Sequence, residues 1–181
     1  MAIKSLKLNA SRDDAIRAFS SRGFANRSWQ MRNGPLQRIA DAYVPCWIYQ
    51  TRYELGGTLQ TRWFALDAVA GSLDLLQIPR LPGPQELFSI ETRNFLQPSL
   101  TVARGEELLR EKVLRSVFQQ GFFKLRGRGL AVVREPVELY LPYWLGFHEK
   151  RGAIRCRVMD AVRRRIEGAK ASAFFEEWLA A

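Results

Sequence analysis

An aromatic motif, Tyr-x-Pro-x-Trp, occurs twice in this chain of 181 residues, and its repetition constrains the fold more than any other feature. The motif residues are Tyr43, Pro45 and Trp47 in the first copy and Tyr140, Pro142 and Trp144 in the second. After each copy comes a glycine-containing turn and then an Asp-Ala-Val sequence, which begins at Asp67 and at Asp160. Matching segments in the same order indicate a duplicated structural unit. We therefore expect the two copies to superpose.

The duplication predicts an α+β protein of two tandem repeats, each a helix followed by an antiparallel β-meander. The predicted parts are repeat 1 over residues 1–77, a proline-rich linker over 78–98, repeat 2 over 99–167 and a C-terminal amphipathic helix over 168–181. The apolar face of that last helix consists of Phe174, Phe175, Trp178 and Leu179. Such a face must be buried, and we favour the chain's own core over a partner.

Each repeat is expected to open with a helix that a glycine ends. Ser11 is a suitable N-cap for the first helix, two aspartates follow it in the first turn, and Gly23 is expected to end it. In the second repeat, apolar residues recur every three or four positions over 106–118, which predicts a helix that ends at Gly121.

Polar and apolar residues alternate after each predicted helix, which is typical of strands. Short strands are predicted at 27–31, 123–126 and 128–134. Each motif then begins a long strand that turns back on itself, at Gly56-Gly57 or at Arg151-Gly152. These hairpins are predicted to pair 42–55 with 58–66, and 139–149 with 153–159. Because proline has no N–H for a strand ladder, Pro45 and Pro142 predict an edge position, a bulge or a bend.

The first hairpin and its ending resemble the PepSY-like modules of the cystatin-like group. The resemblance rests on the run Tyr53-Glu-Leu-Gly-Gly57 and on the run from Phe64 to Leu73, in which aspartate, alanine, two variable residues and Gly71 follow one another. In the second copy Arg164 stands where Gly71 stands in the first, so a continuing helix is expected there in place of a turn. PepSY-like modules are usually secreted or membrane-tethered binding or inhibitory domains. The resemblance therefore implies this fold and a binding role.

The formal net charge is +10, and most of the basic residues are arginines. Six of them form what we call the arginine cluster: Arg151, Arg155, Arg157, Arg163, Arg164 and Arg165. Strand alternation predicts that Arg155 and Arg157 project together into solvent, while Ile154, Cys156 and Val158 face the core. The cluster would suit an anionic partner such as nucleic acid. The alternative is a solvated face that keeps an aromatic-rich protein soluble.

The duplicated aspartates and aromatic residues each allow two interpretations. Asp67 and Asp160 are expected to cap the turns that follow them, and the alternative is an acid/base pair. The motif aromatics Tyr43 and Tyr140 are expected in the core, and so are Trp47 and Trp144, which should be largely buried. The alternative is an exposed surface on which bases or a ligand stack.

Catalytic patterns are scarce in this sequence. His148 is the only histidine, so the sequence predicts no multi-histidine metal site, and no cofactor-binding motif is recognised. The sharpest enzyme interpretation pairs His148 with Cys46 or Cys156 as a nucleophile. Both thiols are instead expected to be reduced strand residues, and no catalytic residue is predicted.

No run approaches the roughly 18 to 20 uncharged residues of a membrane helix, and the first residues lack the apolar segment of a signal peptide. We therefore expect a cytoplasmic protein. The favoured function is a non-enzymatic binding or scaffold protein that engages a protein or peptide through a sheet edge or an inter-repeat groove. The alternative is nucleic-acid binding through the arginine cluster, and a third possibility is an enzyme with an unrecognised site. The oligomeric state and the use of the repeat symmetry stay open.

Overall fold

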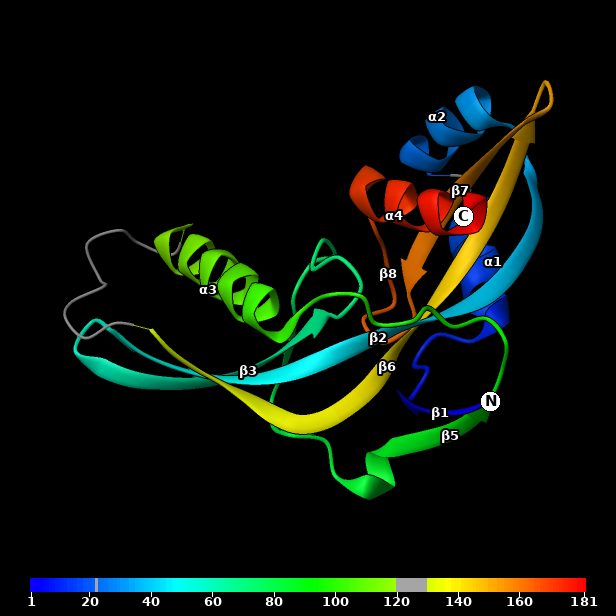
Figure 1. The fold of residues 1–181 in the computed structure, drawn as a ribbon. Coiled ribbons are helices and arrows are strands. Elements are labelled where there is room, and N and C mark those ends of the chain that lie inside the picture. Colours follow the sequence, from blue (N-terminus) through cyan, green and yellow to red (C-terminus); the bar gives the residue numbers. More distant parts are fainter. Residues whose placement is uncertain (22, 120–129) are drawn as a thin grey trace. The chain divides into compact units, whose positions relative to one another are not determined.

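The computed structural model describes the whole chain except residue 22 and residues 120–129, which are grey in Figure 1. The described residues form an α+β protein, as the sequence predicts. The helices are α1 (Arg12–Ser20), α2 (Phe24–Asn33), α3 (Val102–Gln119), α4 (Ala169–Ala180) and the short 3-10 helix η1 (Pro84–Glu86). The strands are β1 (Ala2–Leu6), β2 (Leu36–Leu55), β3 (Thr58–Asp67), β4 (Leu76–Ile78), β5 (Leu87–Glu91), β6 (Ala131–Lys150), β7 (Ala153–Asp160) and β8 (Arg165–Ile166).

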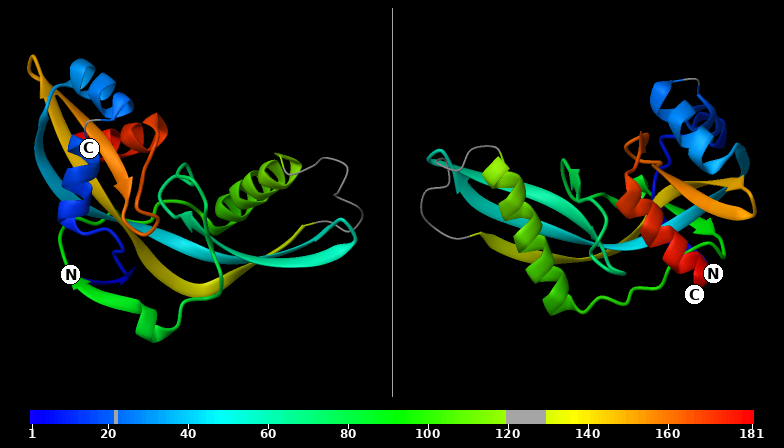
Figure 2. Two further views of the ribbon diagram at one scale, coloured as in Figure 1. Left: turned by 180° about the vertical axis from the view of Figure 1, so that it is seen from behind. Right: turned by 90° about the horizontal axis from the view of Figure 1, so that it is seen from above.

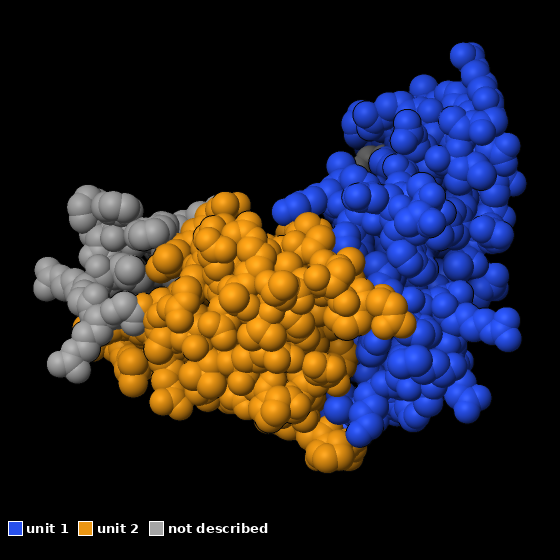
Figure 3. Space-filling model, in the orientation of Figure 1, with its two compact units in different colours: residues 1–44, 86–96, 140–181 blue, residues 45–85, 97–139 orange. Residues whose placement is uncertain are grey.

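These strands form one mixed sheet in the order β4-β3-β2-β6-β1-β5, with β7 paired to β6 and β8 paired to β7. The chain also divides into two compact units (Figure 3). Unit 1 contains residues 1–44, 86–96 and 140–181, and unit 2 contains residues 45–85 and 97–139. Each unit therefore takes segments from both halves of the sequence. The tandem repeats and their boundaries stay a prediction.

Helix α1 forms as expected, because its first turn is capped by local side chains. The Ser11 hydroxyl accepts the Asp14 N–H at 3.1 Å, and the Asp14 carboxylate accepts the Ser11 N–H at 3.0 Å. That backbone hydrogen bond, followed by the one from Arg17, lowers the pKa of Asp14 to about 2. The helix ends at Ser20, before Gly23, so the prediction that Gly23 ends it is wrong.

Gly23 instead precedes α2, and the predicted strand over 27–31 is wrong because these residues are helical. Side chains four residues apart explain the difference. Asn26 donates to the Ala18 carbonyl at 2.7 Å and Gln30 donates to the Phe19 carbonyl at 3.3 Å, so both satisfy the C-terminal end of α1. The alternation seen in the sequence does not bury apolar residues, since Met31 is exposed.

The second helix is found, but the strands that follow it differ from the prediction. Helix α3 begins at Val102, earlier than the predicted 106. Gly121 and the predicted strand over 123–126 lie outside the described residues, as do residues 128 and 129 of the next one. The rest of that strand is not separate, because residues 131–134 continue directly into β6.

Both predicted hairpins are confirmed (Figures 1 and 2). β2 pairs β3 from Cys46 to Leu55, and β6 pairs β7 from Tyr143 to Lys150. Pro45 and Pro142 each precede the first paired residue of their hairpin, on strands that lie inside the strand order rather than at its edge. Their carbonyl oxygens accept the N–H groups of Ala68 and Ala161, at 2.8 and 3.1 Å. Each proline thus stands where a hairpin ladder ends and needs no N–H donor.

Both aspartates cap the turns after the hairpins, as predicted. Asp67 accepts backbone N–H groups from Ala70, Gly71 and Leu73 at 2.8 to 2.9 Å. Asp160 accepts the N–H groups of Val162 and Arg163, both at 2.8 Å. Each carboxylate is buried, so these hydrogen bonds compensate for the loss of its hydration. Both carboxylates are therefore structural.

The turn after β7 keeps the backbone shape of the turn after β3. Gly71 has φ +62°, and Arg164 has φ +57°. The expected continuing helix is therefore wrong, and the arginine occupies a left-handed conformation that favours glycine. Its guanidinium lies 3.5 Å from the Asp14 carboxylate. The Asp160 hydrogen bonds fold this turn even though an arginine stands where the first copy has a glycine.

The core of unit 2 lies between α3 and the β2–β3 hairpin. Trp47, Tyr49 and Leu66 of the hairpin pack with Leu109 and Val113 of α3. The helix comes close because its Gly105 has no side chain. A Cβ at that position would lie 2.7 Å from Tyr49 Oη and 2.8 Å from Trp47 Cζ3. Trp47 is 6% exposed, which confirms its predicted burial.

The core of unit 1 lies between α1 and the β6–β7 hairpin. Phe19 of α1 packs with Met159 and Ala161, and a Cβ on Gly146 of β6 would lie 2.8 Å from its ring. Trp144 is only partly buried, so the prediction for it is too strong. Its indole N–H donates to the Ala10 carbonyl at 2.9 Å, which explains why the ring lies at the border of the core.

Other predicted segments are also ordered. The proposed linker over 78–98 contains β5, whose five residues pair with β1. The C-terminal helix is confirmed as α4, which packs on β7. Phe175 is fully buried against Tyr143, with ring centroids 5.3 Å apart, whereas Leu179 is 49% exposed. The apolar face of α4 is therefore only partly covered.

Gly105→Ala should destabilise the protein, although alanine is normally the better helix residue by about 1 kcal/mol. The added methyl would overlap two buried aromatic rings, so we expect a net loss of about 1 to 3 kcal/mol in the free energy of unfolding. Denaturant melts would measure it. Ser116→Ala, at an exposed position of α3, is the control and should cost nothing. A stabilised Gly105→Ala variant would contradict the packing described.

Arg164→Gly should stabilise the protein relative to Arg164→Ala. Both changes remove the guanidinium, but only glycine adopts φ +57° without steric cost, so we expect a difference of about 1 kcal/mol in favour of glycine. Thermal and denaturant melts of the two variants would measure this difference. Equal stabilities would mean that the left-handed conformation at Arg164 is not kept in solution.

Candidate functional site

The arginine cluster does not form one exposed surface. Arg157 is 8% exposed, and its guanidinium lies 5.3 Å from the centre of the Trp29 ring. The prediction that Arg155 and Arg157 project together into solvent is therefore wrong. On β7, Arg157 lies opposite Gly146, on the face that α2 covers, and helix α2 was not expected there.

Most other members of the arginine cluster lie beside acids. Arg163 contacts Asp160 at 2.6 Å, and both Arg163 and Arg165 contact Glu167 at 3.2 Å. Arg155 lies 3.4 Å from Glu176, and Arg164 lies 3.5 Å from Asp14. Acidic neighbours reduce the positive potential that a phosphate backbone would meet. Apart from the buried Arg157, Arg151 is the one member of the cluster whose side chain has no hydrogen bond or ion pair among the described residues.

Arg157 belongs to a buried polar group under α2. His148 lies edge-on to Trp29, with centroids 6.1 Å apart, and its Nδ1 lies 3.0 Å from the Gly34 carbonyl oxygen. Burial lowers the pKa of Arg157, and burial is also the main reason that the pKa of His148 is lowered. Within the described part of the chain, Trp29 Nε1, His148 Nε2 and Arg157 Nη1 have no hydrogen-bond partner. His148 and Arg157 are buried and Trp29 is partly buried, so the group is not an exposed site.

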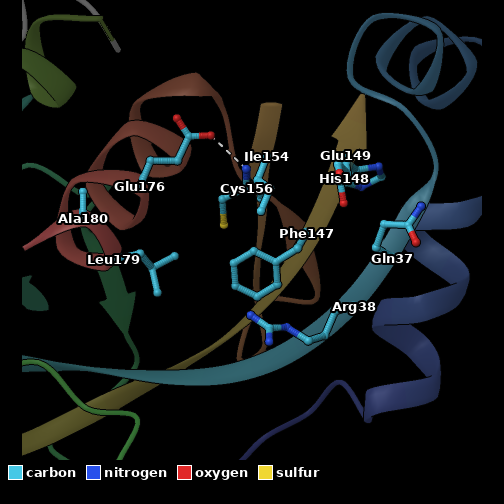
Figure 4. A pocket seen from close by; sticks show the side chains of 10 residues that line it. All are labelled: Gln37, Arg38, Phe147, His148, Glu149, Ile154, Cys156, Glu176, Leu179 and Ala180. Atoms are coloured by element: carbon cyan, nitrogen blue, oxygen red, sulfur yellow. Dashed lines mark hydrogen bonds between the residues drawn. The ribbon is translucent and has the colours of Figure 1, made fainter. Parts of the chain in front are cut away.

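The opposite face of the same hairpin carries a pocket of about 540 Å³ (Figure 4). It lies within unit 1, between β2, the β6–β7 hairpin and α4. The lining residues are Gln37, Arg38, Phe147, His148, Glu149, Ile154, Cys156, Glu176, Leu179 and Ala180. We call it the α4 pocket. Its volume lies within the range of about 300 to 1,000 Å³ that is usual for ligand sites.

The α4 pocket is mainly apolar, and its charged lining residues are one cation, Arg38, and two carboxylates, Glu149 and Glu176. Phe147 projects into it, and Ile154 and Leu179 line it while remaining 63% and 49% exposed. The Arg38 guanidinium lies 4.9 Å from the centre of the Phe147 ring, where it forms a cation–π interaction. No carboxylate pairs with Arg38 in the part of the chain that the structure describes. The pocket therefore suits an apolar group, and Arg38 is the lining residue that could meet a negative charge beside it.

Glu176 fixes α4 to the edge of β7. One carboxylate oxygen accepts the Cys156 N–H at 2.8 Å, and the other lies 3.4 Å from Arg155. This N–H is on the side of β7 that has no strand partner at Cys156, so the side chain stands in for a neighbouring strand. An added peptide strand could not pair with β7 at Cys156 without displacing Glu176. The α4 pocket is therefore suited to side-chain recognition.

Neither thiol has the surroundings of a nucleophile. Burial raises the pKa of Cys46 well above its ordinary value, and burial followed by the charge of Glu176 raises that of Cys156 to about 12. Both are therefore protonated near neutral pH. In unit 1, His148 and Cys156 point to opposite faces of the hairpin, because Cys156 pairs with Phe147 and His148 pairs with Arg155. The described residues include no group of three potential metal ligands.

The motif aromatics do not form an exposed stacking surface. Tyr43 and Trp47 are buried, and Trp144 is half-buried with its N–H bonded. Tyr140 is partly exposed, and its ring lies edge-on to Phe95 at a centroid distance of 6.0 Å. The core interpretation holds for Tyr43 and Trp47, while Tyr140 and Trp144 border the core.

Sequence reasoning did not find the α4 pocket. Leu179 was assigned to an apolar helix face, but nothing in the sequence showed that α4 would leave it uncovered. Arg38 lies in no motif, and its role depends on Phe147, more than 100 residues away. An isolated arginine in a strand carries no signal of this kind.

None of the helices that the structure describes has the length and apolar character needed to cross a membrane. Comparison of the chain with protein-family models, curated proteins and solved structures gives no match.

Proposed function

We propose that this protein is a non-enzymatic binding protein and that its α4 pocket receives an apolar side chain of a peptide or protein segment that also carries a carboxylate. The observation that carries this proposal is the position of Arg38 above Phe147, at an apolar pocket and without an acidic partner among the described residues. Apolar surface supplies affinity, and the guanidinium selects a carboxylate with which it forms charge-assisted hydrogen bonds.

The volume of the α4 pocket favours a short peptide segment as the ligand over the surface of a folded protein. A cavity of about 540 Å³ holds one or two large apolar side chains. The exposed Ile154 and Leu179 extend the apolar surface beyond the cavity. A partner of this chemistry would cover both, which explains why two large aliphatic residues stay exposed beside the same pocket.

Binding through a sheet edge would instead involve strand β5. β5 stands at the end of the strand order, and Phe88 on this strand is 45% exposed. A peptide could add as a strand beside β5 in the way that many recognition domains use. We favour the α4 pocket because it combines a volume of about 540 Å³, a mainly apolar lining and a cation, whereas β5 offers only five residues of edge.

Nucleic-acid binding through the arginine cluster has less support. Arg157 is buried, and four other members lie beside carboxylates. Retention on DNA or RNA at low salt that falls steeply as salt rises would restore this alternative, because phosphate binding releases counterions. Binding of a peptide to the α4 pocket should depend much less on salt.

A displayed peptide library selected on the purified full-length chain should enrich segments that combine a large apolar residue with an acidic residue or a free C-terminus. Affinity of an enriched peptide should fall about fivefold in Leu179→Ala, which removes exposed apolar surface without disturbing the core. Arg38→Gln should reduce affinity about tenfold, because the carboxylate loses its partner. Fluorescence anisotropy with a labelled peptide would measure both.

Two matched controls distinguish binding at the α4 pocket from nonspecific apolar or electrostatic binding. Leu59→Ala removes a more exposed aliphatic residue in unit 2, and Arg12→Gln removes an exposed arginine that does not line the pocket. Both should leave the affinity unchanged. Enriched peptides that bind the Leu179 and Arg38 variants as well as the parent would refute the proposed site.

A further inference from the structure

A second pocket in unit 1 is lined mainly by cations. It has a volume of about 450 Å³ and lies where the end of α2 meets the tip of the β6–β7 hairpin, which Figure 1 shows side by side. Its lining residues are Arg32, Asn33, Lys150, Arg151, Ala153 and Arg155. We call it the basic pocket. Four of its six residues are basic and none is acidic, so its ligand should be an anion.

Strand alternation and the hairpin turn bring these cations together. Lys150 lies opposite Ala153, and Arg155 lies opposite His148, so Lys150 and Arg155 project from the same face of the hairpin toward α2. Glu149, between His148 and Lys150, projects from the other face. The alternation therefore separates the nearest carboxylate in the strand from the basic pocket.

The hydrogen bonds of these cations orient them without removing much charge. Arg32 donates to the Ser28 carbonyl at 3.2 Å and to its hydroxyl at 3.1 Å, and Lys150 donates to the Met31 carbonyl. These acceptors are neutral. Arg155 differs from them, because Glu176 lies 3.4 Å away and offsets part of its charge, although the Arg155 side chain is 58% exposed. Arg32 and Lys150 both lie at the negative end of α2, and Arg151 has no such role.

Arg151 supplies an independent observation. It has φ +54°, whereas Gly56 stands at the matching place in the other hairpin with φ +60°. Turns of this kind favour asparagine or glycine there, so an arginine costs conformational energy. Strained residues of this type are common at binding sites. The arginine at this position places a guanidinium at the basic pocket that a glycine could not provide.

We propose that the basic pocket is a phosphate-binding site that takes the phosphomonoester group of a small molecule. Guanidinium groups match the tetrahedral oxygens of phosphate and form charge-assisted hydrogen bonds with them. The four cations line one hollow, which suits a single dianionic group. The site is separate from the α4 pocket and does not depend on it.

Titration of the full-length chain with inorganic phosphate at constant ionic strength, followed by calorimetry and by the shift in melting temperature, tests this site. The parent should bind phosphate. Arg151→Gly should weaken binding about tenfold or more, because it removes a charge-assisted contact. Glycine relieves the strained turn, so this variant should fold at least as well as the parent, and Arg155→Gln tests a second contact independently.

Arg12→Gln is the matched control, since it removes one positive charge from an exposed position of unit 1 that does not line the basic pocket. It should bind phosphate like the parent. No phosphate binding by the parent would overturn the proposal, as would equal weakening in Arg12→Gln and Arg151→Gly. A single-stranded oligonucleotide that binds without competition from phosphate, and with equal loss in all three variants, would instead assign the charge to a nucleic-acid surface.

Discussion

Each compact unit depends on the packing of a helix from one half of the sequence against a hairpin from the other half. In unit 2, α3 lies on β2 and β3, and Gly105 lets the helix approach Trp47 and Tyr49. In unit 1, α1 lies on β6 and β7, and Gly146 makes room for Phe19. A hairpin with one bare apolar face is not stable in water, so neither core can form from its own half of the chain. Loss of either helix contact would therefore expose a hairpin face.

The packing of each helix on a hairpin from the other half of the chain explains which parts of the fold the sequence could predict. The hairpins, the Ser11 cap and the carboxylate caps at Asp67 and Asp160 depend on residues close together in the chain, and all of them were predicted. The pairing of each helix with a distant hairpin depends on packing between residues that are more than 40 positions apart. Local patterns carry no information about such partners, and the duplication suggested that each helix would stay with its own hairpin.

The errors at α2 and at Arg157 have one cause. The alternation over 27–31 fits a strand as well as a helix, and the choice is made by the hydrogen bonds of Asn26 and Gln30 to the end of α1. Once that segment is a helix, it covers one face of the hairpin and buries Arg157 against Trp29. The α4 pocket and the basic pocket could not be predicted from the sequence either. Arg38 and Arg32 acquire their roles only from neighbours that are remote in sequence.

The β6–β7 hairpin presents a different chemistry on each of its two faces. Phe147, Ile154 and Cys156 point toward α4, whereas Lys150 and Arg155 point toward α2, because successive side chains alternate across a strand. Helices α4 and α2 cover these faces incompletely. A mainly apolar pocket remains beside α4, and a basic pocket remains beside α2. The net charge of +10 is consequently not spread over one basic surface. It is partly paired with carboxylates and partly buried at Arg157, and Arg38 and Arg151 lie beside a pocket without a carboxylate partner among the described residues.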